Sequence, residues 1–160
     1  MPRAVPTPSR EQLKQMRSAA RLFAVQALFQ MEASGSALDD VETEFETHRF
    51  GAEIEGDTYH EGDRDLFRTI LETALANQAA IDQSTDKALV DRWPLGRIDP
   101  TLRALFRAAG GEFKAMRTPP KVVITEFVDV AKAFYPDGRE PKLVNGVLDH
   151  MARAMRPEAF

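Results

Sequence analysis

The stretch SREQLKQMRSAARLFAVQALFQ, residues 9–30, carries two patterns with the same helical period. Its apolar side chains recur every three or four residues, as on the buried face of an amphipathic helix, at Leu13, Met16, Ala20, Phe23, Ala24 and Ala27. Its cations follow the same spacing at Arg10, Lys14, Arg17 and Arg21. Ser9 and Gln12 fit a capping box and Gly35 is a helix terminator, so the sequence predicts a helix from Ser9 to about Ala33.

Helical periodicity continues through the rest of the chain. The predicted helices cover about residues 9–33, 36–48, 63–83, 84–91, 100–116, 119–134 and 141–151. Asp99 before Pro100, and Thr118 before Pro119, each place an N-cap residue ahead of a proline at the first helical position. The stretch VVIT at 122–125 has strand propensity, but the four-, three- and four-residue spacing of the apolar side chains around it favours helix.

The fold class that follows is all-α. We expect one domain over residues 1–160, with about seven helices in two helical halves, about 9–91 and about 97–156. The halves would meet at DRWPLGRIDP, residues 91–100, where two prolines and a glycine interrupt helix formation.

Composition excludes several classes of protein. The chain of 160 residues has no cysteine, which rules out disulfides, thiolate metal sites and cysteine nucleophiles. The opening MPRAVPTPSR lacks the apolar core of a secretory signal, and no apolar run approaches the roughly 20 residues that cross a bilayer. We therefore expect a cytoplasmic protein that makes no membrane contact.

The net charge of −4 hides an uneven distribution. Residues 1–38 hold five basic and two acidic side chains, whereas residues 39–65 hold eleven acidic and two basic ones. Residues 101–160 are basic again, with ten basic and seven acidic side chains. A polyanion responds to the charge within about a Debye length, ~8–10 Å in ordinary salt, so the overall charge does not exclude nucleic acid as a partner.

The four cations of residues 9–30 have two explanations. A solvated helix face is the ordinary one. Two observations favour an external anion instead: Glu11 is the only acidic residue among the first 31, and cations near a helix N-terminus oppose the helix dipole. The stripe therefore predicts contacts to the phosphates of a nucleic acid.

No residues assemble into a catalytic or metal site in the sequence. The acidic stretch 39–65 follows neither an EF-hand order nor a zinc-protease spacing, and we interpret it as solvated or partner-facing surface. His48, His60 and His150 stand alone, without a nearby nucleophile or ligand spacing. We expect no enzyme activity, no cofactor and no bound metal.

Two glycine-containing pairs have structural interpretations. Gly110 and Gly111 lie in a helical stretch, where their missing side chains would let another helix approach closely. Asn145-Gly146 also falls within helical periodicity. We therefore interpret the asparagine as hydrogen-bonded to a neighbouring loop, and the glycine as a position where another helix crosses closely.

Five stretches, in this order, are similar to the NusB family of bacterial transcription antitermination factors: RLFAVQALFQ (21–30), DRDLFRTIL with Ile81-Asp82 (63–82), LRALFRAAGGEF (102–113), PKVVITEFVDVAKAF (120–134) and KLVNGVLD (142–149). The resemblance implies an all-helical, non-catalytic protein. It also implies a complex with the ribosomal protein NusE that binds boxA, a single-stranded RNA element of ribosomal RNA leaders. Such complexes join an antitermination assembly on RNA polymerase. Some members of the family form homodimers, so a homodimer is compatible with the resemblance.

The resemblance also assigns residues. In the family the arginine-rich N-terminal helix touches RNA, which implies RNA contacts for Arg10, Lys14, Arg17 and Arg21. The turn before Val-Asn-Gly faces RNA too, and here it offers Tyr135 for base stacking with Arg139 and Lys142 for phosphate. The partner surface would include Phe29, and Leu102 stands where an acid usually helps to dock the partner.

Further departures from the family are Gly111, where tyrosine is usual, and Thr125, where asparagine is common. Three other functions stay open. A helical accessory domain like that of ribosomal RNA cytosine methyltransferases shares the fold, but the chain lacks the cysteine nucleophile of that chemistry. A pure protein-interaction module would bind through the acidic segment, and a metal-dependent hydrolase would use its carboxylates. The sequence does not distinguish monomer from homodimer.

Overall fold

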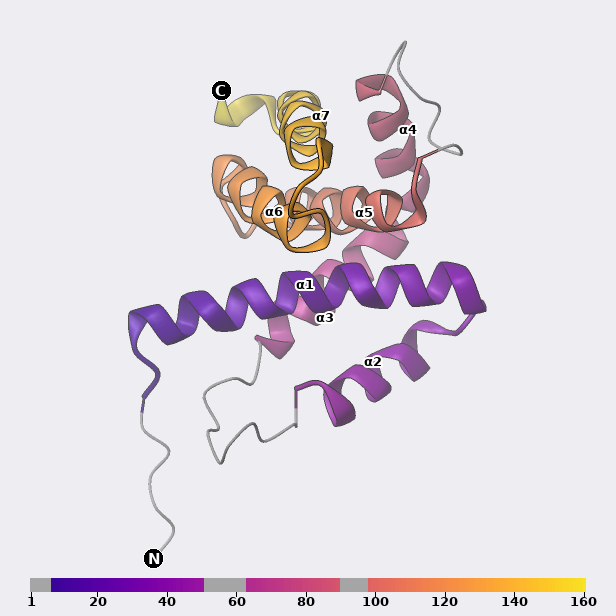
Figure 1. Ribbon diagram of the computed structural model, residues 1–160, viewed down its shortest axis with the longest axis vertical. Coiled ribbons are helices and arrows are strands. Elements are labelled where there is room, and N and C mark those ends of the chain that lie inside the picture. The colour runs from indigo at the N-terminus through magenta and orange to yellow at the C-terminus, as the bar shows by residue number, and fades with distance from the viewer. Residues whose placement is uncertain (1–6, 51–62, 90–97) are drawn as a thin grey trace, which may run out of the picture.

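The computed structural model describes residues 7–50, 63–89 and 98–160, and all regular structure within these ranges is helical (Figure 1). In chain order the described helices are α1 (Arg10–Ser34), α2 (Leu38–His48), α3 (Arg64–Ala76), α4 (Gln78–Ala88), α5 (Pro100–Ala115), α6 (Pro120–Phe134), α7 (Glu140–Met155) and the short 3₁₀ helix η3 (Pro157–Ala159). The predicted all-α class is confirmed. None of the described helices is long and apolar enough to cross a membrane.

Local hydrogen bonds fix both ends of α1. The Gln12 N–H donates to Ser9 Oγ at 3.1 Å, and the Ser9 N–H donates to Gln12 Oε1 at 2.7 Å, which confirms the predicted capping box. At the other end Gly35 adopts φ 71° and donates its N–H to the carbonyl oxygen of Met31. That left-handed conformation favours glycine, so the terminator is confirmed as well.

Several predicted helix boundaries are wrong, and two of the differences have a local cause. The helix expected to run to Gln83 breaks at Asn77, whose side-chain amide donates to the Thr73 carbonyl oxygen at 2.9 Å and competes with the backbone ladder. α6 begins one residue later than expected, with Pro119 at the N-cap and no side-chain cap. The following proline keeps Pro119 out of the helical region, at ψ 136°.

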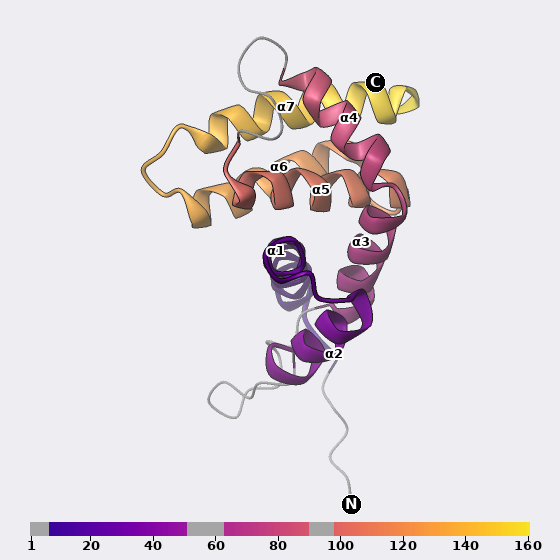
Figure 2. The same ribbon diagram turned by 90° about the vertical axis from the view of Figure 1, so that its right-hand side faces the viewer.

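The core is built around α5, which contacts α1, α3, α4, α6 and α7. Figures 1 and 2 both place α7 above the pair formed by α5 and α6, with α1 below that pair. α4 packs against α5 and α7, so it joins the C-terminal helices although it precedes residues 90–97.

Close helix approach occurs at the predicted glycine pair. A Cβ on Gly111 would lie 2.7 Å from the carbonyl oxygen of Ile70 in α3, and one on Gly110 would overlap the side chain of Ile81 in α4. Gly146 differs, because a Cβ there would meet no atom within 4 Å. The predicted tight crossing at Gly146 is therefore wrong, and the side chain of the exposed Asn145 forms no hydrogen bond with any described residue.

Candidate functional site

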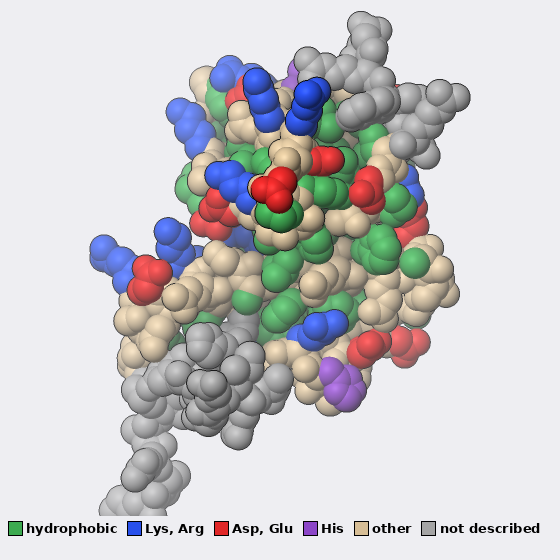
Figure 3. All heavy atoms as spheres, in the orientation of Figure 1, with side chains coloured by type: hydrophobic (Ala, Val, Ile, Leu, Met, Phe, Trp, Pro, Cys, Tyr) green, Lys and Arg blue, Asp and Glu red, His purple; other side chains and the backbone are tan. Residues whose placement is uncertain are grey.

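Three cations on the N-terminal half of α1 are exposed to solvent. Arg10, Lys14 and Arg17 are exposed, and none of them has an ion-pair partner among the residues that the structure describes. Spacings of four and three residues put them on one side of the helix. Figure 3 shows Lys and Arg side chains projecting from this end of α1.

Arg21, the fourth cation of the predicted stripe, has a different environment. It is 2% exposed, and its Nε and Nη2 donate to the two carboxylate oxygens of Glu112 at 2.8 and 2.9 Å. Glu126 lies 3.6 Å from its Nη1. Burial disfavours the charged guanidinium, but the hydrogen bonds and charge of Glu112 outweigh this, so the pKa of Arg21 is raised.

The expectation of an uncompensated, exposed Arg21 is therefore wrong. Arg21 lies where α1 packs against α5 and α6, and both carboxylates that face it come from those helices. Ser18 reinforces the same contact, because its hydroxyl donates to Glu126 Oε2 at 3.2 Å. This part of α1 holds helices together instead of facing a ligand.

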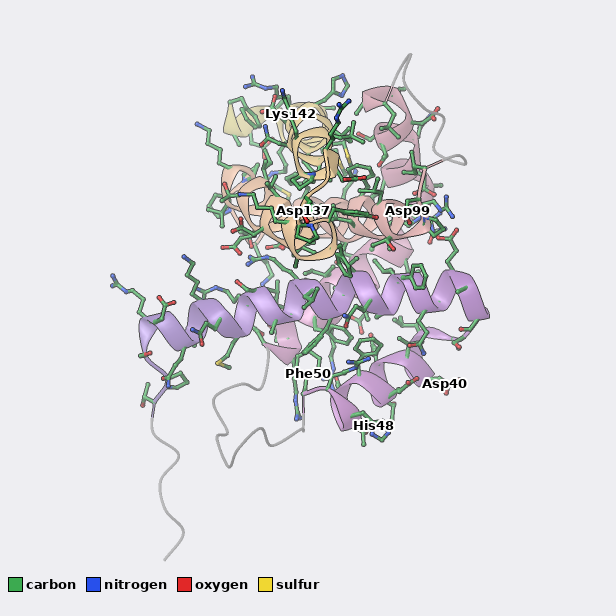
Figure 4. All side chains as sticks on the ribbon, viewed as in Figure 1. Asp40, His48, Phe50, Asp99, Asp137 and Lys142 are labelled. Carbon is green, nitrogen blue, oxygen red and sulfur yellow. The ribbon has the colours of Figure 1, made fainter. Side chains whose placement is uncertain are left out.

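The turn between α6 and α7 carries the second group of candidate RNA contacts. Arg139 in this turn and Lys142 at the start of α7 are exposed, and Figure 4 labels Asp137 in the turn and Lys142 on α7. Tyr135 is half-buried, and its hydroxyl donates to Asp99 Oδ2 at 2.7 Å. Burial and the bond to Asp99 raise the pKa of Tyr135, so the expected freely exposed ring is in fact tethered to the start of α5.

An open groove of about 490 Å³ lies along the C-terminal half of α1. Its walls come from α1, α2, α5 and α6, and include Phe29, Phe45 and Phe134. Phe29, the expected partner contact, is 40% exposed. Figure 3 shows hydrophobic side chains over the middle of α1, between the α6–α7 turn and α2.

Leu102 is not available to a partner. It is 4% exposed and belongs to the buried face of α5, so the expectation that it lies on the partner surface is wrong. The reason is its helical position, because Leu102, Leu105 and Phe106 share one apolar stripe that points into the core.

The acidic segment is described only in part, and His60 falls outside the described residues. In α2, Glu44 accepts from Gln30 Nε2 at 2.9 Å and Glu46 pairs with Arg68 of α3. Within the described ranges, no group of three or more histidine or acidic side chains could hold a metal ion.

Sequence reasoning did not identify the groove itself. Gln26 and Arg49 line it, yet they come from different helices and neither has a local pattern that indicates a site. Phe134 packs against the core and also forms a wall of the groove. Only the resemblance drew attention to Phe29.

Comparison with known proteins gives one consistent result. The model of the NusB family matches residues 18–153. The chain is similar to the transcription antitermination protein NusB of Brucella melitensis, with 43% identity over 99% of this chain and 93% of the relative. It is also similar to the NusB protein of Sinorhizobium fredii, with 46% identity over 95% of this chain and 96% of the relative.

Two solved structures have the same fold. Thermotoga maritima NusB superposes with a TM-score of 0.68 and 26% identity over 93% of each chain. A chain in the crystal structure of the antitermination factors NusB and NusE in complex with double-stranded RNA superposes with a TM-score of 0.69 and 22% identity, covering 88% of this chain and 98% of that one.

Proposed function

Because the chain belongs to the NusB family of transcription antitermination proteins, we propose that it binds RNA together with the ribosomal protein NusE. The RNA is a single-stranded boxA-type element of ribosomal RNA leaders. The complex joins an antitermination assembly on RNA polymerase in the bacterial cytoplasm, and the chain itself catalyses no reaction.

The observation that carries this proposal is the set of exposed cations on the N-terminal half of α1. Arg10, Lys14 and Arg17 are exposed in a protein whose net charge is −4, with no carboxylate within ion-pair distance among the described residues. Cations without a carboxylate partner do not have to break an ion pair when phosphate approaches, and they release counterions from the nucleic acid. A row of such cations along one side of a helix can contact successive phosphates of a nucleic-acid strand.

The α6–α7 turn supports single-stranded RNA as the ligand. Arg139 and Lys142 supply exposed cations there, and Tyr135 supplies an aromatic ring held in place by Asp99. Unpaired bases stack on aromatic side chains, whereas duplex RNA is recognised mainly by shape and backbone.

Replacing Lys14 and Arg17 with alanine tests the RNA surface. We expect weaker binding to a leader RNA that contains boxA, and a log–log salt slope flatter by about 1.4, at about 0.7 for each lost phosphate contact. Fluorescence titration at several salt concentrations measures both quantities, with circular dichroism as a check on helicity. Lys87→Ala is the matched control, because Lys87 is an exposed cation on α4, away from the N-terminal end of α1 (Figure 1).

Three RNA probes sharpen the titration: the single-stranded leader, its duplex, and an unrelated single strand of equal length. Preference for the single-stranded leader supports the proposal, and equal affinity for all three contradicts boxA recognition. If the Lys14/Arg17 variant binds with wild-type affinity and slope, the α1 stripe is not the RNA surface.

The proposed function also includes binding of the protein partner NusE. Phe29 exposes 40% of its surface on the rim of the groove, which suits burial by a protein partner. Native mass spectrometry of the chain, cognate NusE and leader RNA should give one complex containing one copy of each. The same measurement on the chain alone reports whether the free protein is a monomer or a homodimer.

A further inference from the structure

A carboxylate without a hydrogen-bond partner lies at the turn between α6 and α7. Glu140 is the first residue of α7, and its Oε2 is covered but accepts no hydrogen bond from the described residues. The carboxylate rests against Gly138, because a Cβ built on that glycine would overlap Oε2. A covered acceptor is unfavourable until a donor pairs with it, so this oxygen indicates a ligand that brings N–H groups.

Helix capping does not account for Glu140. The N-terminus of α7 has no side-chain cap, and the N–H groups of Lys142 and Leu143 both donate to the carbonyl oxygen of Arg139 at 3.2 Å. Among the described residues, Glu140 forms no ion pair with either neighbouring cation. The helix dipole favours a negative charge in the first turn, but that preference does not require a covered oxygen.

The groups around this carboxylate suit a single-stranded nucleic acid. Tyr135 lies on the other side of the same glycine, since the Cβ built on Gly138 would also lie 3.3 Å from the Tyr135 Cβ. The hydroxyl of Tyr135 donates to Asp99, which restrains the ring. Arg139 is exposed in the same turn, and Figure 2 shows this turn projecting beyond the other C-terminal helices. An aromatic ring, a cation and a hydrogen-bond acceptor therefore lie close together on the surface.

The two oxygens of a carboxylate distinguish among the four bases. Unpaired bases are recognised in part through their Watson–Crick edges. On that edge guanine presents two adjacent donors, N1–H and the N2 amino group, and an ionised carboxylate accepts from both at once. Adenine, cytosine and uracil each present an acceptor beside the donor, and a carboxylate repels that acceptor. The carboxylate of Glu140 therefore fits guanine.

We propose that Glu140 accepts two hydrogen bonds from an unpaired guanine that stacks on Tyr135. Rotation of the side chain away from Gly138 pairs the covered oxygen with one of the two guanine donors. The inference rests on the proposed function in one respect, which is that the ligand is a single-stranded RNA. Cations that contact phosphate position the strand, whereas this carboxylate reads one base of its sequence.

Inosine, which lacks the N2 amino group of guanine, tests the contact in the wild-type chain. Fluorescence anisotropy of the full chain with cognate NusE measures the affinity for the leader RNA and for copies in which each guanine in turn is inosine. One of these substitutions should weaken binding about tenfold, the effect of losing a hydrogen bond to a charged group. If none weakens binding, the inference is wrong.

Glu140→Gln tests whether this residue makes the contact. Glutamine keeps the shape of the side chain but places an amide donor against a guanine donor, so the variant should bind the guanine and inosine forms with equal affinity. Removing a negative charge beside a polyanion otherwise strengthens binding, so weaker binding of the guanine form is not a general charge effect. A wild-type ratio of the two affinities, or tighter binding of both forms, overturns the inference.

Asp137→Asn is the matched control for the change in charge. Asp137 is an exposed carboxylate in the same turn (Figure 4), and its variant should keep the wild-type ratio of the two affinities. Loss of discrimination in this control would show that the charge of the turn sets the preference, which overturns the role of Glu140. Tyr135→Leu should weaken binding of both forms, and wild-type affinity of that variant overturns the stacking contact.

The failure of this inference differs from the failure of the proposed function. If the Lys14/Arg17 variant binds leader RNA weakly while Glu140→Gln keeps the wild-type ratio, the α1 RNA surface stands and guanine recognition by Glu140 is wrong. If the wild-type chain binds the leader, its duplex and the unrelated strand equally, the proposed function and this inference fail together.

Discussion

Arg21 and Glu112 form the most deeply buried ion pair among the described residues. Their side chains are 3% and 0% exposed, and two hydrogen bonds join them across 91 residues of sequence. Both charges have lost their hydration, and each is compensated mainly by the other. Such a pair contributes little net stability compared with apolar residues, but the loss of either member leaves an uncompensated charge in the core.

Single substitutions in this pair should therefore be much more damaging than the double substitution. Arg21→Met or Glu112→Leu alone should lower the free energy of unfolding by about 3–5 kcal/mol, whereas the two together should lose far less than the sum. Urea denaturation of the three variants measures the difference.

The exposed pair Arg153–Asp149 serves as the control. Its side chains are 60% and 46% exposed, so Arg153→Met should change the free energy of unfolding by no more than about 1 kcal/mol. Single substitutions at Arg21 and Glu112 that are equally mild would contradict the account of a desolvated pair.

Arg21 also shows where residue-level prediction fails. Arg10, Lys14, Arg17 and Arg21 follow one spacing, so the sequence predicted one environment for all four. Three are exposed, but the fourth lies where α5 and α6 cover α1. Its partners Glu112 and Glu126 are remote in sequence, and no local pattern could identify them.

At the scale of the helix, the glycines of α5 and α7 have opposite surroundings. Gly111 faces the backbone of α3, where a Cβ would lie 2.7 Å from the Ile70 carbonyl oxygen. Gly146 faces open space. Glycine within a helix is about 1 kcal/mol less favourable than alanine, and of Gly111 and Gly146 it is Gly111 at which close packing offsets that loss.

Alanine at these two positions should therefore change stability in opposite directions. Gly146→Ala should add about 1 kcal/mol, which corresponds to a rise in melting temperature of about 2–4 °C for a chain of this size. Gly111→Ala should lower the free energy of unfolding by about 1–3 kcal/mol, because the backbone oxygen that it meets cannot rotate away. Differential scanning calorimetry of both variants checks this, and a stabilised Gly111→Ala would contradict the close contact.

Helix ends were predictable to the extent that they depend on neighbouring residues. Ser9, Gly35 and Asp99 act within a few positions of themselves, and all three caps are present as predicted. The break at Asn77 was missed because the apolar stripe continues past it, from α3 into α4, and hides the change of direction. Periodicity identifies the buried face of a segment but does not show whether its axis continues.

At the scale of the whole molecule, α1 links two surfaces of different chemistry. Its N-terminal half carries three exposed cations, and its C-terminal half forms one wall of the groove. The cations were predictable because they lie on one helix. The groove was not, because it exists only where side chains from α1, α2, α5 and α6 meet.

The separation of these surfaces along one helix predicts that they act independently at physiological salt. Arg17 and Phe29 are twelve residues apart in α1, which corresponds to about 18 Å at 1.5 Å per residue. This exceeds the Debye length of about 8 Å at 0.15 M salt, so a charge change at one surface is screened from the other. The effects of Lys14/Arg17→Ala and Phe29→Ala on assembly with NusE and leader RNA should therefore add within about 0.5 kcal/mol. A double-mutant cycle at 0.15 M salt measures the coupling, and strong coupling would show that RNA and partner share one surface.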